Sequence, residues 1–209
     1  MRPFFLILLL ALFHHLALAD DKVDESMLSS GATSPKSVFE ESNNFDKQSY
    51  AGLEDIFQDT QSISTHGKYM LLVFGKNGCS YCEMLKQDLK HYSNLRNYIK
   101  EHFSAYYINI SYSKMHHFKI GPTDKPKETM LNTQDLSSIY DVSSTPTLVL
   151  ADPTGKTIYE LPGYMPHVQL LAVLEFVGKG LYKDLNDKQF IEKLRAYILK
   201  KTQEAKNAG

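Results

Sequence analysis

Two cysteines, Cys79 and Cys82, are the residues of this chain best suited to chemistry, and the sequence holds no others. Two thiols at this spacing close a small disulfide and reopen it by exchange, in which a thiolate attacks a disulfide sulfur. The dipeptide between them is Ser80-Tyr81. We interpret Cys79 as the exposed attacking sulfur and Cys82 as the resolving thiol that releases the product.

The cysteine pair has two less favoured interpretations. A zinc site needs two further Cys or His ligands, and outside the N-terminal apolar segment the adjacent histidines available are His116-His117. A purely structural disulfide stabilises more when it closes a longer loop, so one across two intervening residues stabilises little. The pattern therefore favours redox chemistry with no metal and no organic cofactor.

The residues around the pair predict a strand that runs into a helix. Residues 69–74 form a short apolar run ending at a glycine, which is typical of a buried strand. After Cys82, apolar residues recur at Leu85, Leu89 and Tyr92, the spacing of one helix face. The first turn of a helix has unpaired N–H groups and a favourable dipole for negative charge. This placement makes Cys79 easier to ionise, and the thiolate is the reactive form.

The length and charge of the chain set broad limits. It has 209 residues and a formal net charge of −1, which fits one domain and gives no strong attraction for nucleic acid. Residues 1–19 read as a secretory signal, with Arg2, an apolar run over residues 4–13, and Ala17-Leu18-Ala19 before the cleavage point. We expect cleavage after Ala19; an uncleaved N-terminal anchor is the alternative.

The remaining chain divides into a leader, a domain and a tail. Residues 20–48 are polar and predict a flexible leader, residues 49–200 predict the folded domain, and residues 201–209 predict a frayed polar tail. Within the domain, apolar spacing predicts a helix over residues 50–66. Residues 113–132 contain two prolines and predict mostly loop.

The second half of the domain predicts a helix, a hairpin and two more helices. Thr133 is the expected N-cap of a helix over residues 134–140 that buries Leu136, Ile139 and Tyr140. After Thr145-Pro146, a strand from residue 147, the Asp-Pro-Thr-Gly turn and a strand over residues 157–161 form the hairpin. Apolar residues over 168–177 predict one helix. The last helix is expected to start at Asn186 or Asp187 and to bury Phe190, Ile191, Leu194, Tyr197 and Ile198.

This order of elements, with Cys79-Ser80-Tyr81-Cys82 and a later Thr145-Pro146, resembles the thioredoxin fold, an α/β fold with a central mixed sheet flanked by helices, here with an extra C-terminal helix. The resemblance covers roughly residues 50–180. It implies that Pro146 is cis and lies beside the cysteine pair, and that the backbone at Thr145-Pro146 binds the substrate chain.

Within the family, the cysteine dipeptide and Thr145 are most similar to periplasmic disulfide isomerases of the DsbC kind, and the layout to SoxW-like and CcmG-like proteins. The resemblance implies a periplasmic reductase or isomerase that acts on protein disulfides, including apocytochrome c. It further implies a membrane electron donor of the CcdA or DsbD type. The leader is too short for the DsbC dimerisation domain, so we expect a monomer.

The chain departs from cytoplasmic thioredoxin at two positions. The buried aspartate six residues before the first cysteine is replaced by Val73, and the tryptophan before that cysteine by Gly78. The proton acceptor for Cys82 is therefore unassigned, with Glu83 and Lys76 as candidates. Two rival functions remain: a net disulfide oxidant or sulfur-metabolism thioredoxin, and a non-enzymatic metal-binding or chaperone module on the same fold.

Overall fold

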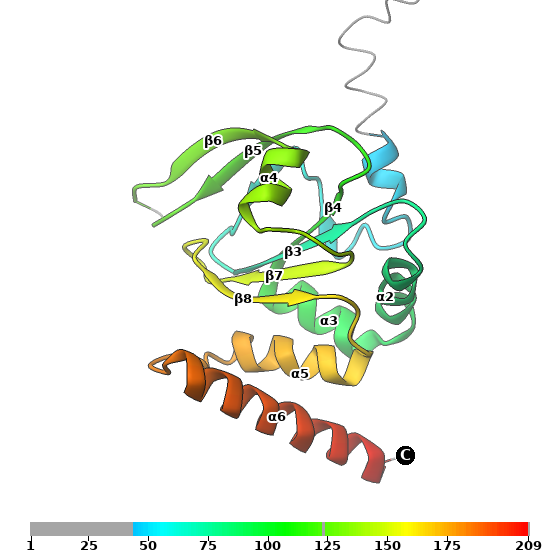
Figure 1. Cartoon of the computed structure of the whole chain (residues 1–209), viewed down its shortest axis with the longest axis vertical. Helices are drawn as coiled ribbons and strands as arrows, with labels where there is room; N and C mark the ends of the chain where they lie inside the picture. Colours follow the sequence, from blue (N-terminus) through cyan, green and yellow to red (C-terminus); the bar gives the residue numbers. More distant parts are fainter. Residues whose placement is uncertain (1–43, 123, 209) are drawn as a thin grey trace, which may run out of the picture. The chain divides into compact units, whose positions relative to one another are not determined.

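A five-stranded sheet forms the centre of the computed structural model, which describes residues 44–122 and 124–208 (Figure 1). The predicted signal and most of the leader lie outside these residues. In spatial order the strands are β1 (Phe57–Gln58), β4 (Phe103–Asn109), β3 (Tyr69–Gly75), β7 (Thr147–Ala151) and β8 (Thr157–Pro162). Strand β3 is parallel to β4 and antiparallel to β7, which makes the sheet mixed, as predicted.

Both faces of the central sheet are covered. Strand β3 is buried along nearly its whole length, and its side chains alternate between two apolar clusters. Leu71 and Val73 pack against helices α2 (Ser80–His91), α3 (Ser93–His102) and α5 (His167–Gly178). Leu72 and Phe74 pack on the other side, where Leu136 of α4 (Thr133–Ile139) lies. This burial fixes the end of β3, from which the cysteine loop starts.

The predicted helix over residues 50–66 is wrong. This segment contains turns, β1, and β2 (Ser62–Ser64). Gly52 has a φ of +81°, a left-handed conformation that glycine adopts without a Cβ penalty and that ends regular helix. Leu53, Phe57 and Ile63 are buried as expected, but from turns and strands, because short apolar spacings fit either arrangement.

The loop predicted over residues 113–132 is also wrong, because it holds a hairpin. Strands β5 (Met115–Ile120) and β6 (Lys127–Asn132) pair antiparallel, and β2 joins β5 to form a second sheet of three strands. Pro122 and Pro126 lie in the connection between the strands, where a missing N–H does no harm to the ladder. The prolines do mark a turn, but the strands on either side of it were not predicted.

Both predicted ends of the domain need correction. Residues 44–48 are helical and Asp46 is 3% exposed, so the end of the expected leader belongs to the folded domain. The expected tail continues helix α6 (Asp187–Ala208). Lys201 pairs with Glu175 of α5 at 3.1 Å, and no glycine or proline interrupts residues 187–208.

The hairpin of β7 and β8 and helix α5 are confirmed, and three details of the helices differ. The cap of α4 is Asn132, whose side chain accepts from the Asp135 N–H, rather than Thr133. Ile139 and Ile191, both expected inside, are 59% and 40% exposed. Among the described residues, no helix is long and apolar enough to cross a membrane.

Candidate active site

The cysteine pair lies where strand β3 gives way to helix α2, as predicted. Cys79 is the N-cap residue of α2, and the N–H of Cys82 donates to Cys79 Sγ at 3.1 Å. The two sulfurs form a disulfide, with the Cα atoms 5.2 Å apart. The Cys79 sulfur therefore sits against unpaired amides of the first helical turn, which favour its thiolate once the disulfide is reduced.

The two cysteines differ in exposure, although less than expected. Cys82 is completely buried and Cys79 is 7% exposed. Cys79 is thus less exposed than predicted, because the segment that carries Thr145 and Pro146 lies against its sulfur. An incoming disulfide nonetheless reaches Cys79 first, since Cys82 presents no surface.

The predicted contact between the cysteine pair and Thr145-Pro146 is confirmed. The Thr145–Pro146 peptide bond is cis. The Thr145 hydroxyl donates to Cys79 Sγ at 3.4 Å, and the Thr145 carbonyl oxygen lies 3.4 Å from the same sulfur. Thr145 is half-buried and Pro146 is buried. A second hydrogen-bond donor is therefore aimed at the sulfur, from a segment 66 residues away in sequence.

The dipeptide between the cysteines faces outward. Ser80 is exposed, and Tyr81 is 57% exposed. The Tyr81 ring stacks on Tyr164, with centroids 6.2 Å apart, and the Tyr164 hydroxyl donates to Asp88 at 2.7 Å. Burial and this hydrogen bond raise the pKa of Tyr164 to about 12, so it remains a donor. Met84, on the same helix as Tyr81, is 42% exposed. The contact of Tyr81 with Tyr164 was not predicted, because the two residues are far apart in sequence.

The loop before Cys79 is held by a group of hydrogen bonds that the sequence analysis missed. Asn77 donates from its backbone N–H to Ser111 Oγ at 2.9 Å and from its amide to the Tyr112 hydroxyl at 2.8 Å. Its side-chain oxygen accepts from Asn109 at 2.8 Å. Gly78, at φ +67°, then turns the chain into Cys79. These contacts fix the loop to the end of β4.

Tyr107 is the residue of β4 paired in register with Val73, which stands where cytoplasmic thioredoxin has an aspartate. Burial raises the pKa of Tyr107 above its usual range. A Cβ on Gly75 would lie 2.0 Å from the Tyr107 hydroxyl, so this tyrosine packs directly against the end of β3. The structure therefore places a phenol, rather than an acid, at this depth.

Of the two candidate proton acceptors, Glu83 has a defined partner. Its carboxylate pairs with Lys86 at 2.6 Å, and the Lys86 ammonium lies 5.7 Å from the centre of the Tyr107 ring. Lys76 is exposed. Lys86 is four residues after Cys82 and hence on the same face of α2. The acceptor for Cys82 stays unassigned.

The histidines of the Met115-His116-His117 motif point to opposite sides of strand β5. His116 is buried, and its Nδ1 donates to the Thr60 carbonyl oxygen at 2.7 Å. Its Nε2 lies 3.0 Å from the Thr133 hydroxyl, and burial lowers the pKa of the imidazole. His117 instead pairs with Glu128. Among the described residues, no three His, Cys, Asp or Glu side chains are grouped as a metal site would need.

The chain matches the family described as Thioredoxin-like domain over residues 56–178. It therefore belongs to this family. Together with the Cys79–Cys82 pair beside Thr145-Pro146, this membership defines a thioredoxin-fold thiol–disulfide oxidoreductase.

A thioredoxin-fold protein from Helicobacter pylori is similar at 64% identity, with a TM-score of 0.75 over 76% of this chain and 99% of that one. Two other solved structures are more distant. A mutant thioredoxin from Halobacterium salinarum is 18% identical over 60% of this chain and 91% of its own, with a TM-score of 0.38. A Thermus thermophilus thioredoxin is 21% identical over 54% and 75%, with a TM-score of 0.39. No curated protein matches the chain.

Proposed function

We propose that this protein is a periplasmic thiol–disulfide reductase and isomerase that reduces apocytochrome c or mispaired protein disulfides. The observation that carries the proposal is the position of Cys79 Sγ, which meets the Cys82 N–H at 3.1 Å and the Thr145 hydroxyl at 3.4 Å. Two donors on one sulfur stabilise a thiolate there. A stable thiolate that is reached from outside is what attack on a substrate disulfide requires.

The reaction proceeds by two exchanges. The Cys79 thiolate attacks one sulfur of the substrate disulfide, forms a mixed disulfide, and expels the other substrate sulfur as a thiolate. Cys82 then loses its proton and attacks Cys79, which frees the second substrate sulfur. The substrate gains two electrons and, in water, two protons, and the enzyme is left with the Cys79–Cys82 disulfide. A membrane dithiol of the CcdA or DsbD type returns both electrons.

The surface around the pair supports an extended protein substrate. Thr145 contacts Cys79 Sγ, and Tyr81, which lies between the two cysteines in sequence, stacks on Tyr164. Aromatic rings provide large contact area at low conformational cost. We propose that the substrate chain runs along Thr145-Pro146, and that a monomer suffices because these contacts come from one chain.

A net oxidant is the alternative, and the residues near Cys79 favour the reductase. Oxidants of the DsbA type stabilise their thiolate so strongly that the reduced form dominates. Here the dipeptide Ser80-Tyr81 adds no charge, and the Lys86 ammonium is already paired with Glu83. The support for the thiolate is therefore moderate, which favours the reductase over the oxidant.

The proposal is tested with an oxidised peptide carrying the Cys-x-x-Cys-His haem attachment sequence. We expect the reduced protein to transfer its electrons to this disulfide in a single turnover, and to re-pair scrambled ribonuclease more slowly. Free thiols are counted by alkylation and mass spectrometry. A reduced protein that leaves the peptide oxidised, or a disulfide form that oxidises the dithiol peptide to completion, would contradict the proposal.

A further inference from the structure

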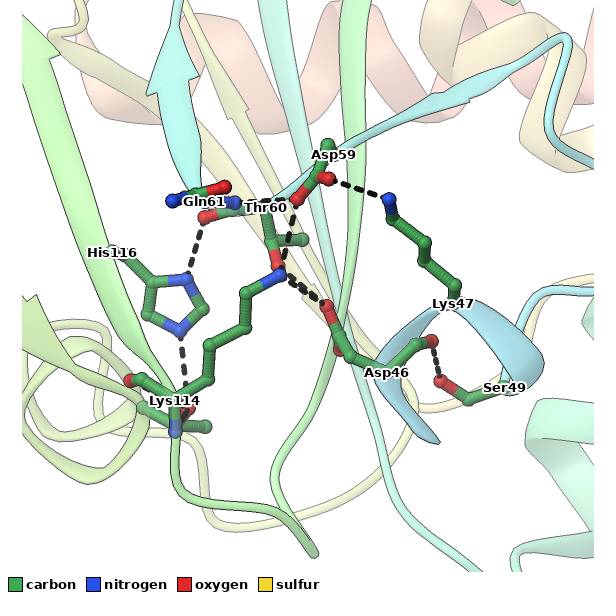
Figure 2. Close-up of polar contacts among 9 residues, drawn as sticks. Asp46, Lys47, Ser49, Asp59, Thr60, Gln61, Lys114 and His116 are labelled. Carbon is green, nitrogen blue, oxygen red and sulfur yellow. Dashed lines mark hydrogen bonds and ion pairs between the residues drawn. The ribbon is translucent and has the colours of Figure 1, made fainter. Parts of the chain in front are cut away.

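The segment that precedes β1 packs against residues that flank the cysteine pair, namely Tyr112 and Lys86, although it was expected to form the end of a leader and the start of a helix. We call residues 45–50 the brace. Its anchor is Asp46, which accepts from Thr60 Oγ1 at 2.5 Å and from Lys114 Nζ at 3.1 Å (Figure 2). Lys114 also pairs with Asp59 at 3.1 Å. The Asp46 and Lys114 side chains are 4% and 5% exposed.

This anchor is costly to break because the opposite charges of Asp46 and Lys114 are both buried. A buried ammonium that loses a partner carries an uncompensated charge, which is costly. Burial would raise the pKa of Asp59, but hydrogen bonds from the Gln61 N–H, Lys47 and Lys114 hold it at about 2. Asp59 therefore remains ionised at neutral pH, and the cluster fixes the brace to the core.

One end of the brace leads to the loop before Cys79. The Phe45 ring stacks on Tyr112, with centroids 5.4 Å apart and planes 16° apart. The Tyr112 hydroxyl accepts from the Asn77 amide at 2.8 Å. Asn77 is two residues before Cys79, so two contacts in series, the ring stack and the hydrogen bond, connect the helical turn of the buried anchor to the loop that carries the attacking sulfur.

The other end of the brace reaches the helix that carries Cys82. The Ser49 carbonyl oxygen accepts from Lys86 Nζ at 2.9 Å, and Lys86 lies one turn after Cys82. Tyr50, which is 3% exposed, packs on Tyr107 with centroids 6.3 Å apart. The brace thus contacts helix α2 directly through Lys86, and it reaches the loop before the cysteines through Tyr112.

We infer that the brace positions the redox pair, with Phe45 and Tyr112 as positioning residues for Cys79. The hydrogen bond from the Cys82 N–H to Cys79 Sγ depends on the position of Cys79 relative to the first turn of α2. Asn77, which is bound to Tyr112, fixes the loop that sets this position. This inference rests on the thiol-exchange function proposed above and adds to it a part of the chain outside the matched residues 56–178.

The test compares Tyr112→Phe and Phe45→Leu with Gln48→Ala in the full chain. Tyr112→Phe keeps the ring stack and removes the hydroxyl that Asn77 binds, and Phe45→Leu keeps an apolar side chain without the stack. Gln48 lies in the same helical turn, is exposed, and is not one of the charged residues that anchor the brace. It is the matched control for any effect of destabilising the turn.

The measurement is the pH dependence of alkylation of Cys79 by iodoacetamide in the reduced proteins, together with the rate of insulin reduction. We expect the Cys79 pKa to rise in both brace variants, and alkylation at pH 7 to slow roughly three- to tenfold, the size of one lost hydrogen bond. Gln48→Ala should follow the wild-type profile. Profiles of Tyr112→Phe and Phe45→Leu that superimpose on wild type, even if both proteins unfold more easily, would overturn the inference.

This experiment separates failure of the inference from failure of the proposed function. A wild-type protein that does not reduce insulin contradicts the function, whatever the variants do. A wild-type protein that reduces insulin, beside brace variants with unchanged Cys79 profiles, contradicts the inference alone.

Discussion

Replacing Cys79 by serine is expected to abolish reduction of insulin disulfides with dithiothreitol as electron source. Serine keeps the size of the side chain, but its hydroxyl is not ionised at neutral pH and cannot form the mixed disulfide. We expect the rate above the uncatalysed reaction to fall on the order of 10²-fold or more, because no other residue supplies the nucleophile. The turbidity of reduced insulin gives the rate, and circular dichroism checks that the variant is folded.

Activity that remains in Cys79→Ser would show that the role assigned to Cys79 is wrong. If Cys79→Ser stays folded and keeps most of its activity, the attacking sulfur is not Cys79. Loss of activity on chelation of metal ions in the wild-type protein would instead support the metal-binding alternative. We expect activity to be unaffected by chelators.

Replacing Cys82 by serine is expected to trap the enzyme on its substrates. Cys79 still attacks, but nothing resolves the mixed disulfide. Complexes sensitive to reductant should accumulate in cells expressing Cys82→Ser and be nearly absent with Cys79→Ser. Alkylation followed by non-reducing electrophoresis shows them. Complexes that accumulate with Cys79→Ser and not with Cys82→Ser would reverse the two roles.

The burial of each cysteine gives this prediction its physical basis. Cys82 is fully buried and Cys79 is 7% exposed, so Cys79 is the one of the two that has any surface for a protein disulfide to reach. If a substrate binds as proposed, it must fit closely against Thr145 and Pro146, since the Cys79 sulfur does not project from the surface.

The sequence predicted the redox site well because its elements are defined locally. An apolar run that ends at a glycine, followed by cysteines and an apolar helix face, specifies a strand-to-helix junction without knowledge of the rest of the fold. The contact of Thr145 with Cys79, across 66 residues, came from the family resemblance. The periodicity of apolar residues alone does not predict that these two segments are in contact.

The sequence did not predict the brace or the second sheet, and the reasons differ. Asp46 and Lys114 read as solvated charges in polar stretches, and only the fold shows that they are buried against each other. Residues 113–132 contain two strands, but the prolines between them and the exposed Met130 on β6, at 56% exposure, hide the alternation. In both cases the structure depends on partners that are distant in sequence: Lys114 for Asp46, and β2 for β5.

The measurement that tests the central claim most directly is the reduction potential of the Cys79–Cys82 pair, determined by equilibration with glutathione and quantified by alkylation. The account predicts a potential between about −180 and −270 mV, the range of protein disulfide isomerase and thioredoxin. A pair in this range passes electrons to substrate disulfides once a donor dithiol has reduced it. A potential near −120 mV, that of DsbA, would contradict the reductase and assign the protein as a disulfide oxidant.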